Sequence, residues 1–225
     1  MRVFLFDVDG TLVDSGRQAR PAFAATLVEV FGSAGSIDAY DFSGKTDARI
    51  VVDLAVGAGI DEREARAALP RVRELYVERF ARSFDPARAR VLPGVEALLA
   101  ALAVRGDAAL GLLTGNWRAG AKIKLGALGL FDYFPFGSFA DDGLDRRELP
   151  PVALERARRH TGRELTAADA VIVGDSPLDV DCARAHGIAC LAVATGWTSR
   201  RALAAEGATW VVDDLSAALA HPAFA

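Results

Sequence analysis

The sequence predicts an α/β fold in which a doubly wound parallel sheet carries an inserted helical domain. From Pro93 onward, short apolar runs alternate with stretches of helical periodicity, a pattern typical of βαβ units with right-handed crossovers. An apolar run at residues 3–6 precedes this pattern and is followed by about seventy residues without a convincing strand. We therefore expect residues 1–14 and 87–225 to form the α/β core, and residues 15–86 to form a helical cap over the first strand.

Composition bounds the possible functions. The 225 residues are long enough for one large domain or for a domain with a smaller one inserted, and at 52% hydrophobic and 25% charged they can form a sizeable core. A formal net charge of -4 supports neither nucleic acid nor an anionic membrane as a partner. Three scattered histidines support neither a catalytic triad nor a zinc site. Cys182 and Cys190 are expected to be small core residues, and the absence of a signal-peptide pattern leads us to expect a cytoplasmic enzyme.

The first strand ends in two acidic residues. The unbroken apolar run Val3–Phe6 is typical of a strand buried on both faces. Side chains alternate along a strand, so Asp7 and Asp9 should point to the same side, about 6–7 Å apart. Open α/β sheets bind ligands at this end of their strands. Two adjacent carboxylates repel each other there unless a cation lies between them.

Two other interpretations of this stretch compete with a cation site. The acids could simply cap backbone groups in an Asp-Gly turn. An EF-hand loop beginning at Asp7 would need a glycine where Leu12 stands and a closing glutamate where Gln18 stands, so that interpretation fails.

The cap and the core are predicted as follows. Helices are expected at residues 16–31, 47–57 and 61–82, with Pro70 interrupting or kinking the third. In the core, the helices are expected at residues 95–104, 118–128, 151–160, 178–186, 199–206 and 216–220. The core strands are expected at residues 108–114, 134–136, 170–174, 189–194 and 209–212.

Two later strands also end in polar residues. Residues 108–113 lead into Thr114-Gly115-Asn116, whose hydroxyl and amide groups suit an anionic oxygen, or simply cap the next helix. Residues 170–174 lead into Asp175, and Asp179 follows one turn later. Both acids could cap that helix. Four carboxylates converging on one edge of the sheet, however, point to a hard divalent cation with oxygen ligands.

These motifs resemble those of the haloacid dehalogenase superfamily of hydrolases, in the branch with a helical cap after the first strand. Residues 7–13 resemble its first motif, Thr114 its second, and Gly174-Asp175 with Asp179 its fourth. The resemblance covers essentially the whole chain and is greatest to phosphoglycolate-phosphatase-like members. It implies a Rossmann-like core.

One cap segment adds to the resemblance, and the third motif departs from it. Residues 44–47 (Gly-Lys-Thr-Asp) resemble the cap loop that faces the active site, whereas a P-loop would need a glycine at Ala39 and a preceding strand. The third motif usually supplies a lysine, but here the corresponding segment contains Arg146 and Arg147. Arginine also binds phosphate through its fork of donors, so either could take the role, unless the segment is a solvated charge cluster.

The resemblance implies a magnesium-dependent phosphatase. Asp7 would be the nucleophile that forms an aspartyl-phosphate, and Asp9 the acid and base for the leaving group and the water. Mg²⁺ would be held by Asp7, the Asp9 carbonyl and Asp175, with Asp179 orienting a metal-bound water or another ligand.

The phosphoryl group would be held by Thr114 together with Arg146 or Arg147. The other residues expected to line the phosphate are Gly10, Thr11, Gly115 and Asn116. Lys45 and Arg49 are expected to contact the leaving group, with Arg17 and Arg20 as weaker candidates. The partner would be a small phosphorylated metabolite, with glycolate, a sugar or a nucleoside all compatible as the leaving group, and the chain a monomer or homodimer.

Three rival functions stay open at this point. The dehalogenases of the superfamily lack the second aspartate, so Asp9 argues against carbon–halogen cleavage. A β-phosphoglucomutase-like phosphomutase keeps both acids and is the nearest rival; it would exclude water and return the phosphoryl group to a sugar. A non-catalytic binding protein would be expected to have lost one or more motifs.

Overall fold

A six-stranded parallel sheet forms the centre of the computed structural model, which describes residues 1–224. The strand order is β5-β4-β1-β6-β7-β8. The strands are β1 (Arg2–Phe6), β4 (Ala108–Leu113), β5 (Phe136–Ser138), β6 (Ala170–Gly174), β7 (Ala189–Val193) and β8 (Trp210–Val212). β1 pairs with β4 on one side and β6 on the other, so the first strand occupies the middle of the sheet.

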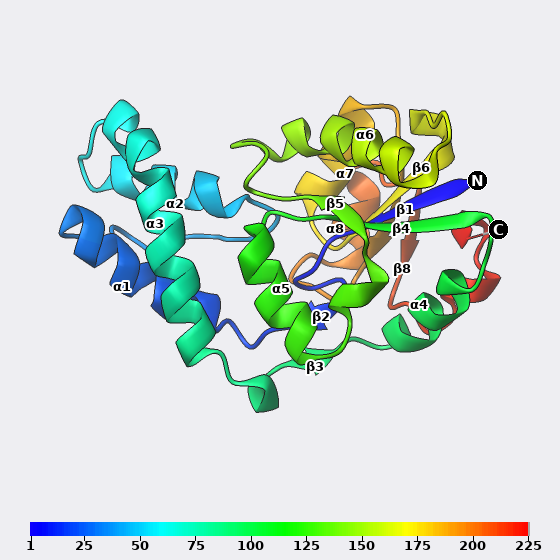
Figure 1. Cartoon of the computed structure of the whole chain (residues 1–225), viewed down its shortest axis with the longest axis horizontal. Helices are drawn as coiled ribbons and strands as arrows, with labels where there is room; N and C mark the ends of the chain where they lie inside the picture. The colour runs from blue at the N-terminus through cyan, green and yellow to red at the C-terminus, as the bar shows by residue number, and fades with distance from the viewer. Residues whose placement is uncertain (225) are drawn as a thin grey trace.

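Helices cover both faces of this sheet (Figure 1). They are α4 (Val95–Ala103), α5 (Arg118–Ala127), α6 (Leu149–Thr161), α7 (Pro177–Ala185) and α8 (Arg200–Ala205). Short 3₁₀ turns lie at Pro86–Arg88, Phe131–Tyr133, Arg146–Glu148, Ala167–Asp169, Ala218–Ala220 and Pro222–Phe224. The predicted doubly wound α/β fold is confirmed.

The sheet is buried on both sides because β1 is apolar at every position from Val3 to Phe6. Phe4 and Phe6 pack into a cluster with side chains of α4 and α5. Val3 and Leu5 pack on the opposite face with side chains of α6, α7 and α8. Each of these four side chains is fully buried. Burial of each of these side chains contributes about 1.5–3 kcal/mol to the stability of the core.

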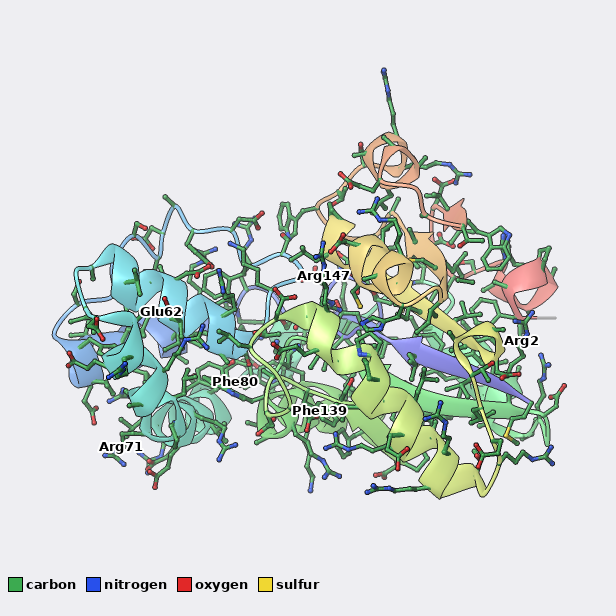
Figure 2. The ribbon with its side chains drawn as sticks, turned by 90° about the horizontal axis from the view of Figure 1, so that it is seen from above. Arg2, Glu62, Arg71, Phe80, Phe139 and Arg147 are labelled. Carbon is green, nitrogen blue, oxygen red and sulfur yellow. The ribbon has the colours of Figure 1, made fainter. Side chains whose placement is uncertain are left out.

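The insertion between β1 and β4 is helical, as predicted. It consists of α1 (Ala19–Phe31), α2 (Asp47–Gly57) and α3 (Glu62–Ser83), which lie to one side of the sheet in Figure 1. Its hydrophobic core contains Phe23, Tyr76 and Phe80 and extends to Trp117 of the α/β core. Figure 2 shows Phe80 where α3 meets the α/β core. The exact boundaries at residues 14/15 and 86/87 stay a prediction.

A short antiparallel pair, missed by the sequence analysis, lies at the base of the insertion. β2 (Val13–Asp14) pairs with β3 (Arg90–Val91), so the chain segments that enter and leave the helical region are hydrogen-bonded to each other. Two-residue strands carry too little periodicity to be recognised in a sequence.

Local capping explains where the insertion's helices begin. The Thr46 hydroxyl accepts a hydrogen bond from the Arg49 amide at the start of α2. Asp61 accepts from the Arg63 and Glu64 amides at the start of α3. Of the two effects expected of Pro70, interruption is wrong, because α3 continues through this exposed residue, and a kink there stays a prediction.

Two core elements differ from the prediction. The strand expected at residues 134–136 begins at Phe136, since Phe134 closes a 3₁₀ turn and Pro135 has no amide hydrogen to donate. The final helix expected at residues 216–220 is only the 3₁₀ turn Ala218–Ala220. Pro222 disfavours helical backbone in the residue before it, which limits this turn.

Two findings bear on the composition arguments. Cys182 in α7 and Cys190 in β7 are free and buried, as predicted. Within residues 1–224, the structure contains no helix that combines the length and apolar character needed to span a bilayer.

Candidate active site

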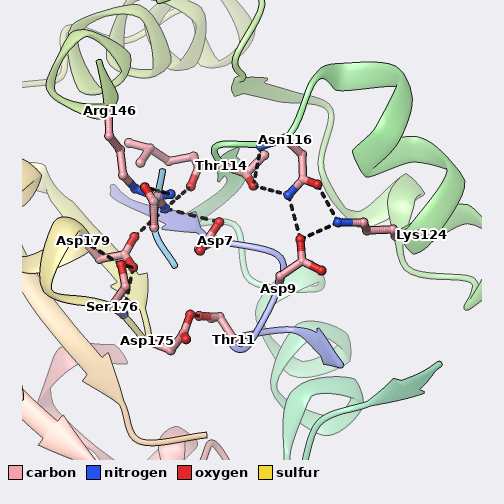
Figure 3. Close-up of polar contacts among 12 residues, drawn as sticks. Asp7, Asp9, Thr11, Thr114, Asn116, Lys124, Arg146, Asp175, Ser176 and Asp179 are labelled. Atoms are coloured by element: carbon pink, nitrogen blue, oxygen red, sulfur yellow. Dashed lines mark hydrogen bonds and ion pairs between the residues drawn. The ribbon is translucent and has the colours of Figure 1, made fainter. Parts of the chain in front are cut away.

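Three neighbouring parallel strands deliver polar residues to one edge of the sheet. β1 ends before Asp7, β4 before Thr114, and β6 before Asp175. Figure 3 shows these side chains gathered around a common centre. The turn after β1 allows this close approach, since Gly10 has φ +81° and a Cβ there would lie 2.3 Å from Asp175 Oδ2. Thr11 Oγ1 donates to Asp175 Oδ1 at 3.1 Å.

Asp7, Asp175 and Asp179 form a buried acidic cluster. Each offers a carboxylate oxygen, and the three oxygens lie within 4.8 Å of one another. Burial raises the pKa of Asp7 to about 6, although the nearby Arg146 guanidinium partly opposes this rise. Burial, together with repulsion from Asp7 and Asp179, also raises the pKa of Asp175 well above its usual value. Hard oxygen ligands with uncompensated negative charge fit a divalent cation such as Mg²⁺.

Arg146 is the guanidinium that reaches this cluster. The residue is buried, and its Nη2 lies 3.2 Å from Asp7 Oδ1 and also pairs with Asp179 Oδ1. It donates to the carbonyls of Leu113 and Gly44 as well. Its Nε atom is buried without a hydrogen-bond partner among the described residues.

Arg147 points elsewhere. It pairs with Asp181 at 2.6 Å, and its side chain is 58% exposed. The two arginines that the sequence left equivalent therefore occupy different environments, one inside the acidic cluster and one on the surface.

Asp179 also caps a helix, as the alternative interpretation expected. Ser176 Oγ donates to Asp179 Oδ2 at 2.6 Å, and the Ser176 amide donates to the same oxygen at 3.0 Å. The other carboxylate oxygen of Asp179 faces Arg146. The side chain thus ties the start of α7 to the arginine of the cluster.

Asp9 lies apart from this cluster in its bonding. Its Oδ1 accepts from Ser15 Oγ at 2.7 Å, and its Oδ2 accepts from Asn116 Nδ2 at 2.9 Å and Lys124 Nζ at 2.6 Å. Burial alone would raise the pKa of Asp9, but the Lys124 ammonium and these hydrogen bonds lower it below the usual value.

The segment after β4 connects both groups of residues. Thr114 is fully buried, and its Oγ1 accepts from Asn116 Nδ2 at 2.8 Å. Gly115 packs against the cap, since a Cβ there would lie 2.1 Å from the Lys45 carbonyl oxygen. The Asp47 amide donates to the Gly115 carbonyl at 2.6 Å.

The loop at residues 44–47 docks on the α/β core. Gly44 accepts from Arg146, and Thr46 Oγ1 donates to the Leu144 carbonyl at 2.6 Å. Asp47 Oδ2 accepts from the Trp117 amide at 2.8 Å. This loop therefore lies over the strand ends, as predicted for it.

The two cap cations predicted to contact substrate have partners within the cap. Lys45 Nζ lies 3.9 Å from the centre of the Tyr40 ring, and Arg49 pairs with Asp53 at 2.9 Å. Neither is among the cations that contact the acidic cluster. Their proposed contact with a leaving group stays a prediction.

Lys124 is the main residue that the sequence analysis missed. It lies in α5 beside the buried Ala121 and Leu125, so it is a lysine on an apolar helical face. A charged residue within such a stripe needs a buried partner, and this was the available signal. The partner could not be identified without the fold.

Comparisons with known proteins identify similar chains. Residues 4–193 match the model of a family described as haloacid dehalogenase-like hydrolase. A phosphoglycolate phosphatase of Rhodospirillum rubrum is 33% identical over 227 residues, covering 96% of this chain and 88% of that protein. Phosphoglycolate phosphatase 1 of Pseudomonas aeruginosa is 32% identical over 219 residues, covering 95% and 77%. A hydrolase from Pseudomonas syringae has the same fold, with a TM-score of 0.70, 23% identity, and coverage of 98% and 97%.

Proposed function

This chain belongs to the haloacid dehalogenase-like hydrolase family, and from that premise we propose that it is a magnesium-dependent phosphatase. It hydrolyses a small phosphomonoester through an aspartyl-phosphate intermediate. The observation that carries the proposal is the convergence of Asp7, Asp175 and Asp179 with Arg146 at the ends of the central strands.

The charges of this cluster support a metal-dependent reaction. Three carboxylates face one guanidinium, so a phosphate dianion would meet net negative charge. Asp7, the Asp9 backbone carbonyl and Asp175 would hold Mg²⁺, with Asp179 orienting one of its ligands. When bound, the cation supplies the positive charge that lets a phosphate approach a carboxylate.

The protein residues then divide the remaining work. Asp7 attacks phosphorus and becomes the phosphorylated residue. Arg146 and the Thr114 hydroxyl hold phosphoryl oxygens, with Gly10, Thr11, Gly115 and Asn116 around them. Asp9, protonated in the substrate complex, gives that proton to the leaving oxygen and later takes one from the attacking water.

Phosphoglycolate is the first substrate to test, because the curated relatives carry that activity in their names. Lys45 and Arg49 lie on the cap loop and the following helix, from which a leaving group's polar atoms could be contacted. The proposed partner is thus a small phosphorylated metabolite, and the predicted cytoplasmic location suits such a substrate.

The test measures phosphate release from a panel of phosphomonoesters with Mg²⁺ and then with excess EDTA. We expect release with Mg²⁺ and its loss in EDTA. Isomerisation of a sugar phosphate without phosphate release would favour the phosphomutase instead. Chloride release from chloroacetate without metal would favour the dehalogenase, and no reaction with any substrate would favour a binding protein.

A further inference from the structure

Lys124 is a buried cation beside Asp9, and the proposed reaction assigns it no role. The chain has three lysines, and among the described residues Lys124 is the one that is buried. Its Nζ donates to Asp9 Oδ2 and to Asn116 Oδ1, both at 2.6 Å (Figure 3). Its side chain is 4% exposed.

Asn116 is held in one orientation by this lysine. Its carbonyl oxygen accepts from Lys124, so its amide nitrogen faces Asp9 at 2.9 Å and Thr114 Oγ1 at 2.8 Å. The reverse orientation would place a carbonyl oxygen against the Asp9 carboxylate and the amide hydrogens against an ammonium group. Lys124 therefore orients Asp9 twice, once directly and once through Asn116.

The surroundings of Lys124 argue against a purely stabilising role. Its ammonium lies 5.7 Å from the centre of the Phe80 ring of the cap, and the neighbouring positions of α5 are apolar. Replacing a buried ion pair with apolar side chains of similar volume is often neutral or stabilising. Packing alone would thus be served by a methionine or leucine at this position.

We propose that Lys124 is a positioning residue that, together with Asn116, holds the Asp9 carboxylate in the orientation needed for proton exchange with the leaving oxygen and the attacking water. This inference rests on the proposed function, because it assigns Lys124 to the acid–base step of that reaction. It also separates the cations of the site: Arg146 serves the nucleophile and Lys124 serves the acid–base residue.

The test compares Lys124→Met with Lys122→Met, which removes an exposed ammonium from the same helix. We expect Lys124→Met to lower kcat by about 10–100-fold, as outer partners of catalytic groups do, with a much smaller change in KM. Lys122→Met should behave like the wild type. An unchanged kcat in Lys124→Met would overturn the proposal.

A double-mutant cycle separates positioning from general damage. Asp9→Asn should lower kcat by about 10²–10⁴-fold, and adding Lys124→Met to it should cause little further loss. Losses that multiply would show that Lys124 acts independently of Asp9 and would overturn the proposal. Lys124→Arg, which keeps a positive charge, should recover part of the lost kcat and covers the case in which the methionine variant folds poorly.

A structural measurement keeps this inference distinct from the proposed function. In a crystal structure of Lys124→Met, we expect the Asp9 carboxylate and the Asn116 amide to leave the orientation described above. Side chains that stay in place would overturn the positioning role even if the wild type is an active phosphatase. A wild type that releases no phosphate would instead count against the proposed function.

Discussion

The two sides of the candidate active site contain the same kind of residue in opposite electrostatic situations. On one side, Asp7, Asp175 and Asp179 share a single guanidinium, and the pKa values of Asp7 and Asp175 are raised. On the other side, Asp9 accepts directly from the Lys124 ammonium, and its pKa is lowered. Asp7 and Asp9 are only two positions apart in the sequence.

This difference follows from the number of cations on each side, because three carboxylates share one guanidinium whereas Asp9 accepts directly from an ammonium. Desolvation alone would raise the pKa of Asp7, Asp175 and Asp9, and of these three only Asp9 has enough donors to reverse that effect. The side with excess negative charge is suited to recruit a cation and then a phosphate. The side with Asp9 and Lys124 is suited to hold one carboxylate in a fixed orientation.

The largest expected effect comes from the side with three carboxylates. Asp7→Asn should lower phosphatase turnover by more than about 10³-fold, because the neutral amide cannot attack phosphorus. The measurement is steady-state phosphate release together with a search for the phosphorylated enzyme by mass spectrometry after acid quench. Turnover near the wild-type rate would mean that the nucleophile is misassigned.

The next effect tests which arginine acts on the side with three carboxylates. Arg146→Ala should lower kcat by about 10²–10³-fold, since it removes the donors closest to Asp7. Arg147→Ala is the matched control and should leave kcat near the wild-type value, because this side chain pairs with Asp181 on the surface. Arg146→Lys should retain more activity than the alanine variant. Equal losses in both alanine variants would contradict the separation of the two arginines.

Stability without added metal should respond in opposite directions on the two sides. Asp175→Asn relieves repulsion with Asp7 and Asp179 and should raise the free energy of unfolding at pH 7.5. Asp9→Asn leaves Lys124 buried without its carboxylate and should lower it, by about 1–3 kcal/mol. A loss near 1 kcal/mol is expected, because the Asp9 side chain is 39% exposed and water can replace its carboxylate as a partner of Lys124. Urea unfolding in EDTA measures the free energy of unfolding of both variants. Shifts of the same sign would contradict the electrostatic difference between the two sides.

The last effect is a change in the pH dependence of stability, and it concerns a second carboxylate near Lys124. Burial raises the pKa of Asp47 to about 7, although the Lys124 charge and the Trp117 amide oppose the rise. The folded state then holds a proton that the unfolded state releases above its pKa of about 4, so the stabilising contribution of Asp47 is complete below pH 4 and is lost as the pH rises to 7. Asp47→Asn should remove up to about 1.4 kcal/mol per pH unit of this slope. Unfolding measured between pH 5 and 7 tests this, and an unchanged slope would place the proton elsewhere.

Many of these features could be predicted from local sequence patterns. Periodicity and turn residues act over a few positions, so they can be recognised in the sequence. They predicted the apolar run before Asp7, the alternation of strands and helices after Pro93, and the acids after β6. The start of α2 at Asp47 was predicted for the same reason, and the structure adds that Thr46 caps it. Parallel strands bring their carboxyl ends to one edge, so Asp7, Thr114 and Asp175 could be grouped from their positions after predicted strands.

The sequence by itself determined the doubly wound core, the helical insertion and the carboxylates at the strand ends. Only the tertiary structure decided that Arg146 turns inward while Arg147 turns to Asp181, and that Lys124 meets Asp9 from 115 positions away. Adjacent residues of the same type have the same local propensities, and a lysine on an apolar helix face has no local partner. What separates them is the long-range packing that decides which charge is desolvated beside which neighbour.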